Sequence, residues 1–156
     1  MDTQIMIEGA YMSELDNDIK NLEDTVDNII EIAKKYSIYD FISGGIKITT
    51  IRRFTQREKD IFSISTDTLR KICKRIDELS DNTFSYLYKL NYLLEDFVNK
   101  NIDVLKTKKL VDLGISRETL KRMKNNEEGQ PYYLNTLVKY AKLIESWRCT
   151  SVEKPV

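Results

Sequence analysis

Two stretches of the chain, GIKITTIRRF at residues 45–54 and GISRETLKRM at residues 114–123, follow the same pattern. Each begins with glycine and isoleucine, and each carries a threonine and an arginine at matching positions. With a one-residue adjustment the similarity extends to residues 68–76 and 136–144, which both begin with Thr-Leu. Because the same pattern recurs 69 residues apart, the sequence predicts a duplicated helical module.

Each copy predicts a short helix, a glycine turn, an isoleucine that fills the space between helices, and a second short helix with basic residues on its outer side. In the second copy, residues 110–122 followed by residues 131–143 resemble the Cro/Xre-type helix-turn-helix family of phage and plasmid repressors. The resemblance implies that the helix after the Gly-Ile-Ser turn is the DNA recognition helix. It also implies that the later Thr-Leu helix closes the core.

The segments outside the repeated pattern also have helical periodicity. Apolar residues from Leu15 to Tyr36 alternate at intervals of three and four, which predicts a long amphipathic helix with a cap at Ser13. We expect this apolar stripe either to pack within its own domain or to form a homodimer seam. A helix is also expected after an N-cap at Ser65. The remaining helices are expected near residue 48 and over residues 83–100, 105–113, 117–124 and 134–147.

The expected fold class is all-α, with two tandem helix-turn-helix units joined by long helices. Glycine, proline and polar clusters mark the boundaries. We predict an N-terminal segment with the start of the long helix at 1–24, one unit at 25–81, a second unit at 82–148, and a flexible tail at 149–156.

Composition argues against several classes of function. The chain of 156 residues has no histidine, and it has no glycine-rich phosphate loop or Gly-x-Ser-x-Gly motif. We therefore expect neither an enzyme nor a metal or cofactor site. The two cysteines, Cys73 and Cys149, do not form a disulfide pattern, and no signal peptide or apolar membrane span is evident. These features predict a cytoplasmic protein.

Charge is unevenly distributed along the chain. The formal net charge is zero, and residues 1–50 hold ten acidic residues against four basic ones. Residues 47–59 and 106–124, by contrast, are strongly basic and contain the second helix of each copy. Basic groups on a helix that can enter the major groove predict a double-stranded DNA partner.

The candidate DNA-binding residues lie on and beside these second helices. In the first copy the expected groove face is Ile48, Thr49, Arg52 and Gln56, with Lys47, Arg53, Arg57 and Lys59 near phosphates. In the second copy it is Arg117, Glu118, Lys121 and Asn125, with Lys108, Lys109, Arg122 and Lys124 near phosphates.

These observations predict a sequence-specific DNA-binding transcription regulator or repressor, of the kind found in phages, plasmids or mobile elements. The alternative is a protein-binding inhibitor or adaptor that retains the helix-turn-helix fold, which the zero net charge keeps open. Tyr86, Tyr88, Tyr132 and Tyr133 could stack on bases, but half-buried packing is the commoner role of such residues.

Overall fold

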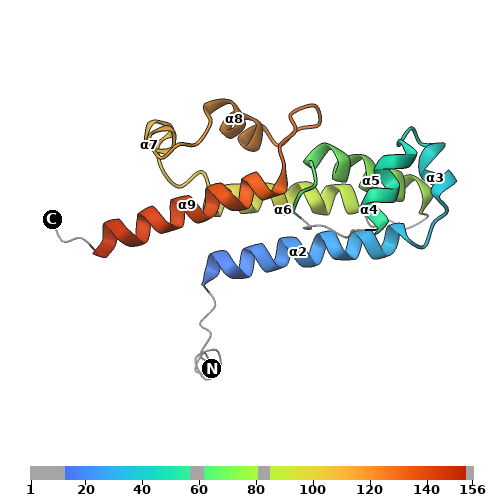
Figure 1. Ribbon diagram of the computed structural model, residues 1–156, viewed down its shortest axis with the longest axis horizontal. Helices are drawn as coiled ribbons and strands as arrows, with labels where there is room; N and C mark the ends of the chain where they lie inside the picture. Colours follow the sequence, from blue (N-terminus) through green and yellow to red (C-terminus); the bar gives the residue numbers. More distant parts are fainter. Residues whose placement is uncertain (1–12, 57–61, 81–84, 154–156) are drawn as a thin grey trace, which may run out of the picture.

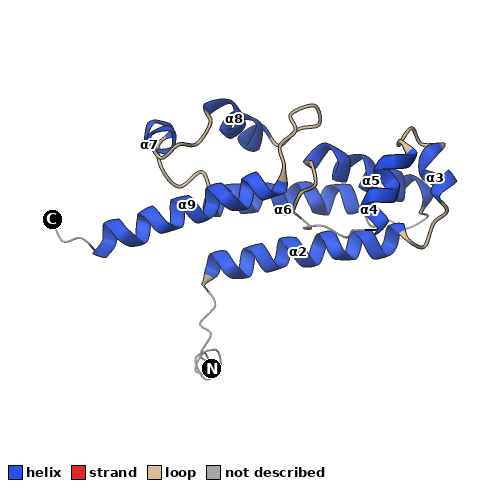
Figure 2. Ribbon diagram, viewed as in Figure 1, coloured by secondary structure: helices blue, strands red, loops and turns tan. Residues whose placement is uncertain are grey.

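The computed structural model describes residues 13–56, 62–80 and 85–153. Across these ranges the regular secondary structure is helical (Figure 2), apart from one isolated β-bridge. The prediction of an all-α fold is confirmed for this part of the chain. None of the described helices is both long and apolar enough to cross a membrane. The helices are α2 (Glu14–Ala33), α3 (Ile38–Ile42), α4 (Ile48–Gln56), α5 (Thr66–Leu79), α6 (Tyr86–Asn101), α7 (Thr107–Asp112), α8 (Arg117–Asn125) and α9 (Leu134–Glu153).

Helices α2 and α6 lie side by side and run in opposite directions along the long axis of the molecule (Figure 1). The short helices α3 and α4 lie near one end of this pair, and α7 and α8 lie near the other (Figure 1). Helix α5 packs against α6, and α9 packs against both α2 and α6. The two Gly-Ile stretches, residues 45–54 and 114–123, therefore lie near opposite ends of the α2 and α6 pair.

Serine residues start five of the helices. The side-chain oxygen of each accepts a hydrogen bond from a backbone N–H in the first turn, which stabilises a helix by about 1 kcal/mol per cap. The predicted caps at Ser13 and Ser65 are confirmed. At α3 the cap is reciprocal, because Asp40 also accepts from the backbone N–H of Ser37 at 2.9 Å. The five cap residues are Ser13, Ser37, Ser65, Ser85 and Ser116.

The apolar stripe of α2 is used inside the chain. Its side chains face α4, α5, α6 and α9, so packing within one molecule accounts for the periodicity of the sequence. The stripe is covered and is not available for the homodimer seam considered between Leu15 and Tyr36. The buried residues of α2 are Leu15, Leu22, Val26, Ile29, Ile30 and Ala33.

Helix ends differ from the prediction in two places. Helix α2 ends at Ala33, because the chain turns there and Tyr36 packs its ring edge-on against Phe41 at 6.2 Å between centroids. Helix α9 continues past Trp147 to Glu153, since neither glycine nor proline interrupts it before Pro155. The predicted boundaries after residues 24 and 148 thus lie inside α2 and α9.

The segments that lead into α5 and α9 meet in an antiparallel β-bridge between Ser65 and Tyr133. The backbone N–H of Thr66 donates to the carbonyl of Tyr132 at 2.9 Å, and the N–H of Leu134 donates to the carbonyl of Ile64 at 3.0 Å. These bonds join residues that are 66 and 70 positions apart in the chain. They hold the starts of α5 and α9 next to each other.

Candidate nucleic-acid interface

The turns before α4 and α8 have the same backbone structure. Gly45 has φ of 91° and Gly114 has φ of 100°, a region that favours glycine. The N–H of Ile46 donates to the carbonyl of Phe41 at 3.1 Å, and the N–H of Ile115 donates to that of Leu110 at the same distance. Both isoleucines are buried. The alignment of the two glycine turns by sequence therefore corresponds to matching local structure.

Helices α4 and α8 each bury one face and expose the other. Ile51 and Phe54 anchor α4, whereas Leu120 and Met123 anchor α8 at the positions that the alignment pairs with them. Helix α4 packs on α2, and α8 packs on α6. Because these contacts use the apolar side of each helix, the polar side faces solvent.

On α8 the predicted groove-facing residues come together. The side chains of Arg117, Glu118, Lys121 and Asn125 are exposed, and they line a surface hollow of about 680 Å³. The hollow is completed by Arg122 and by the loop at Gly129 and Gln130.

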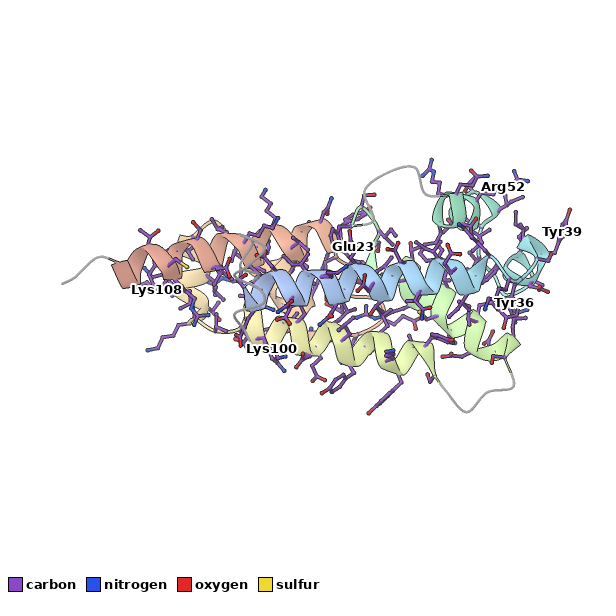
Figure 3. The ribbon with its side chains drawn as sticks, turned by 90° about the horizontal axis from the view of Figure 1, so that it is seen from below. Glu23, Tyr36, Tyr39, Arg52, Lys100 and Lys108 are labelled. Atoms are coloured by element: carbon purple, nitrogen blue, oxygen red, sulfur yellow. The ribbon has the colours of Figure 1, made fainter. Side chains whose placement is uncertain are left out.

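On α4 the corresponding side is also exposed. Thr49, Arg52 and Gln56 face solvent, and Ile48 leaves 39% of its surface uncovered. Figure 3 shows Arg52 projecting away from the α2 and α6 pair. This exposure satisfies the steric requirement that the predicted groove face be uncovered by the described helices.

The residues predicted to contact phosphates have varied surroundings. Lys47, Arg53 and Lys108 are exposed, and Lys108 projects from the edge of the molecule (Figure 3). Arg57 and Lys59 lie outside the described residues. The other three have partners: Arg122 with Glu118 at 3.1 Å, Lys124 with Asp103 at 3.2 Å, and Lys109 over the ring of Trp147 at 4.6 Å from its centroid.

The tyrosines fall into two groups. Tyr132 is buried and Tyr86 is partly covered, as expected for packing residues. Tyr88 is 74% exposed and Tyr133 is 56% exposed, so these two are more open than half-buried packing predicts.

Sequence reasoning missed the most buried charge in the described chain. Arg70 on α5 is 2% exposed, and its guanidinium donates to the side-chain oxygen of Asn91 at 3.0 Å and to that of Asn126 at 2.7 Å. It also donates to the carbonyl of Glu127 at 3.1 Å. Asn126 ends α8 in the left-handed conformation. Arg70 therefore fixes the C-terminal end of α8 to α5.

A signal for this role was present in the alignment of the two copies. Arg70 corresponds to Val138 in the second copy, so an arginine occupies a place where the related helix carries an apolar residue. Val138 is also buried.

Burial determines the chemistry of two further side chains. It raises the pKa of the Cys73 thiol, and the nearby charge of Asp77 raises it further. It also raises the pKa of Tyr132 to about 12, although Arg70 opposes this effect. Cys73 is thus held as a neutral thiol in the core, which makes it a packing residue. In the described residues no group of three or more His, Cys, Asp or Glu side chains could hold a metal ion.

Comparison with known proteins gives no relative: no protein-family model, curated protein or solved structure matches the chain.

Proposed function

We propose that the chain is a sequence-specific regulator that binds double-stranded DNA, with two helix-turn-helix units formed by α3–α4 and α7–α8. The observation that supports this most strongly is the pair of matching glycine turns, each followed by a helix whose polar face is open to solvent. A helix of this size can enter a major groove when its outer face is uncovered. The protein acts by occupying DNA in the cytoplasm of a host cell and requires no catalytic group.

The side chains on α8 suit recognition of a G·C pair. Arg117 lies at the first turn of α8 and can donate two hydrogen bonds to guanine. Glu118 can accept from the amino group of cytosine, and its ion pair with Arg122 at 3.1 Å orients the carboxylate. Lys121 lies one turn further along the same exposed side.

Loss of two cations from α8 tests this proposal. The full chain is first used to enrich binding sequences from a random duplex pool, and affinity is then measured by fluorescence anisotropy at several salt concentrations. Arg117→Ala with Lys121→Ala should weaken binding about 30-fold or more, because each base or phosphate contact is worth about 1–3 kcal/mol. The slope of log affinity against log salt should decrease by about 1 to 2.

The matched control is Lys20→Ala with Lys100→Ala. It removes the same formal charge from exposed positions on α2 and α6 that are not among the proposed DNA contacts. Its affinity should remain within about threefold of the parent chain, because distant charges are screened by salt. Equal losses in both double variants would show that only overall charge matters and would contradict the assignment of α8.

A protein-binding role is the second candidate, and one surface favours it. Tyr88 and Tyr92 lie four residues apart on α6 and are 74% and 63% exposed. Exposed aromatic residues on one helix face are frequent anchors of protein interfaces. If the random pool yields no enriched duplex and the affinity of the chain for DNA does not change with salt concentration, the adaptor function replaces the DNA-binding function.

A further inference from the structure

The two halves of the chain contact each other through reciprocal hydrogen bonds. The sequence alignment that pairs Thr68 with Thr136 also pairs Thr66 with Leu134 and Ile64 with Tyr132. The bond from Thr66 to Tyr132 therefore becomes the bond from Leu134 to Ile64 when the halves are exchanged. Contacts in which i meets j and j meets i are the property of a two-fold interface.

The packing of the helices follows the same exchange. If α2 to α5 are matched in order with α6 to α9, the α2–α4 contact corresponds to α6–α8, and α2–α5 corresponds to α6–α9. Between the halves, α5–α6 corresponds to α9–α2, and the antiparallel α2–α6 pair corresponds to itself. The α3–α4 and α7–α8 segments lie near opposite ends of that pair (Figure 1). These contacts follow an approximate internal two-fold axis, which does not extend to the first short helix of each half: α3 packs on α4 and α5, whereas α7 has no comparable contact with α8 or α9.

We propose that a single chain, without dimerising, binds two inverted and non-identical half-sites on one DNA duplex, with α4 in one and α8 in the other. This inference rests on the proposed DNA-binding function. Inverted half-sites follow from the internal axis, because a two-fold protein matches the dyad of duplex DNA.

The half-sites differ because the two exposed faces carry different chemistry. Ile48 and Thr49 present methyl groups at the start of α4, which suit the methyl group of thymine. Arg117 and Glu118 take the corresponding places on α8 and suit guanine and cytosine. One half-site is therefore richer in A·T pairs and the other in G·C pairs.

The distance between the half-sites is set by the packing of the protein. The buried guanidinium of Arg70 joins α5 in the first half to Asn91 and Asn126 in the second. The β-bridge at Ser65 and Tyr133 adds a second connection. Both connections join the two halves of the protein and hold them in a fixed arrangement. If the half-sites on the DNA are moved apart, one half of the protein therefore cannot move to follow them.

The test uses the full chain and sequences enriched from a random duplex pool. The enriched motif should contain two different blocks, one richer in A·T pairs and one richer in G·C pairs, about 10 base pairs apart from centre to centre. Sedimentation or native mass measurement should give one chain of 18.3 kDa per duplex. Inserting about 5 base pairs between the blocks turns one of them to the opposite side of the helix, and affinity should fall at least tenfold.

Substitutions on α4 and α8 show which helix reads which block of the DNA motif. Ile48→Ser with Thr49→Ser takes away the methyl groups and should remove base preference in the A·T-rich block only. Arg117→Ala with Lys121→Ala should remove it in the G·C-rich block only. Lys20→Ala with Lys100→Ala should leave both preferences intact. A single block of preferred bases, or two chains on each duplex, would overturn this inference while leaving DNA binding in place. If no duplex is enriched, the proposed function itself fails.

Discussion

Arg70 is a single side chain on which the contact between the halves depends. Its guanidinium is withdrawn from water and makes three hydrogen bonds, and Asp67 lies 3.7 Å away. A buried charge of this kind is tolerated only when its hydrogen bonds are made. Asn126 is the C-terminal cap of α8, and its side-chain amide donates to the carbonyl of Asn91. Loss of Arg70 would therefore also disturb the end of α8.

Replacement of this residue should destabilise the fold. Arg70→Met keeps much of the side-chain volume but leaves two asparagine oxygens and the Glu127 carbonyl without their donor. We expect the free energy of unfolding to fall by about 3 kcal/mol, measured by urea denaturation. Lys71→Met changes the exposed neighbour on α5 and should have an effect below about 0.5 kcal/mol. A chain that tolerates both substitutions equally would show that the Arg70 contacts contribute little.

Tyr132 predicts how stability depends on pH. Its phenol is buried, and no hydrogen-bond partner for its oxygen is found among the described residues. Since the folded pKa is raised to about 12, the unfolded chain loses this proton near pH 10 while the folded chain keeps it. The contribution of the protonated Tyr132 phenol to the free energy of unfolding is therefore complete below about pH 10, and it is lost as the pH rises toward 12.

Tyr132→Phe should remove this part of the pH dependence. Between about pH 10 and 12 the free energy of unfolding of the variant should decline less steeply than that of the parent chain. At neutral pH the variant should be equally stable or slightly more stable, because a buried hydroxyl without a partner is costly. Denaturation at a series of pH values measures both effects, and identical slopes for the two proteins would refute the prediction.

At the scale of the elements, local sequence signals predicted much of the structure. Serine caps marked the starts of α2 and α5, and the Gly-Ile pairs marked both turns, because these signals act over only a few residues. The end of α9 was missed, since no glycine or proline precedes Pro155 and the helix continues beyond Ile144, the last buried residue in the part of the chain that the structure describes. The groove-facing residues of α8 were placed correctly on an exposed side, but their function stays a prediction.

The two glycine turns should respond alike to substitution. In Gly45→Ala and Gly114→Ala the added methyl group meets no atom within 4 Å, so the cost comes only from the positive φ. We expect each variant to lose about 1–2 kcal/mol of unfolding free energy. Gly44→Ala provides a contrast, because its methyl group would collide with Cδ of Arg75. If Gly45→Ala and Gly114→Ala differ by more than about 1 kcal/mol, the turns are not equivalent.

At the scale of the whole molecule, the repeated Gly-Ile pattern was visible in the sequence but the way the two halves of the chain pack was not. Periodicity showed that α2 has an apolar stripe, yet it could not identify the covering surface. The coordinates place that surface in the same chain. Likewise, Arg70 joins residues more than fifty positions apart, and its alignment with Val138 could not identify those partners.

The bridge at Ser65 and Tyr133 lies within one polypeptide, and under the proposed function this has a consequence for DNA binding at low protein concentration. A repressor assembled from separate subunits loses its paired form when few copies are present in a cell. Under the proposed function one chain presents both α4 and α8 to DNA, so the fraction of duplex bound would rise in proportion to the concentration of the chain, without an assembly threshold.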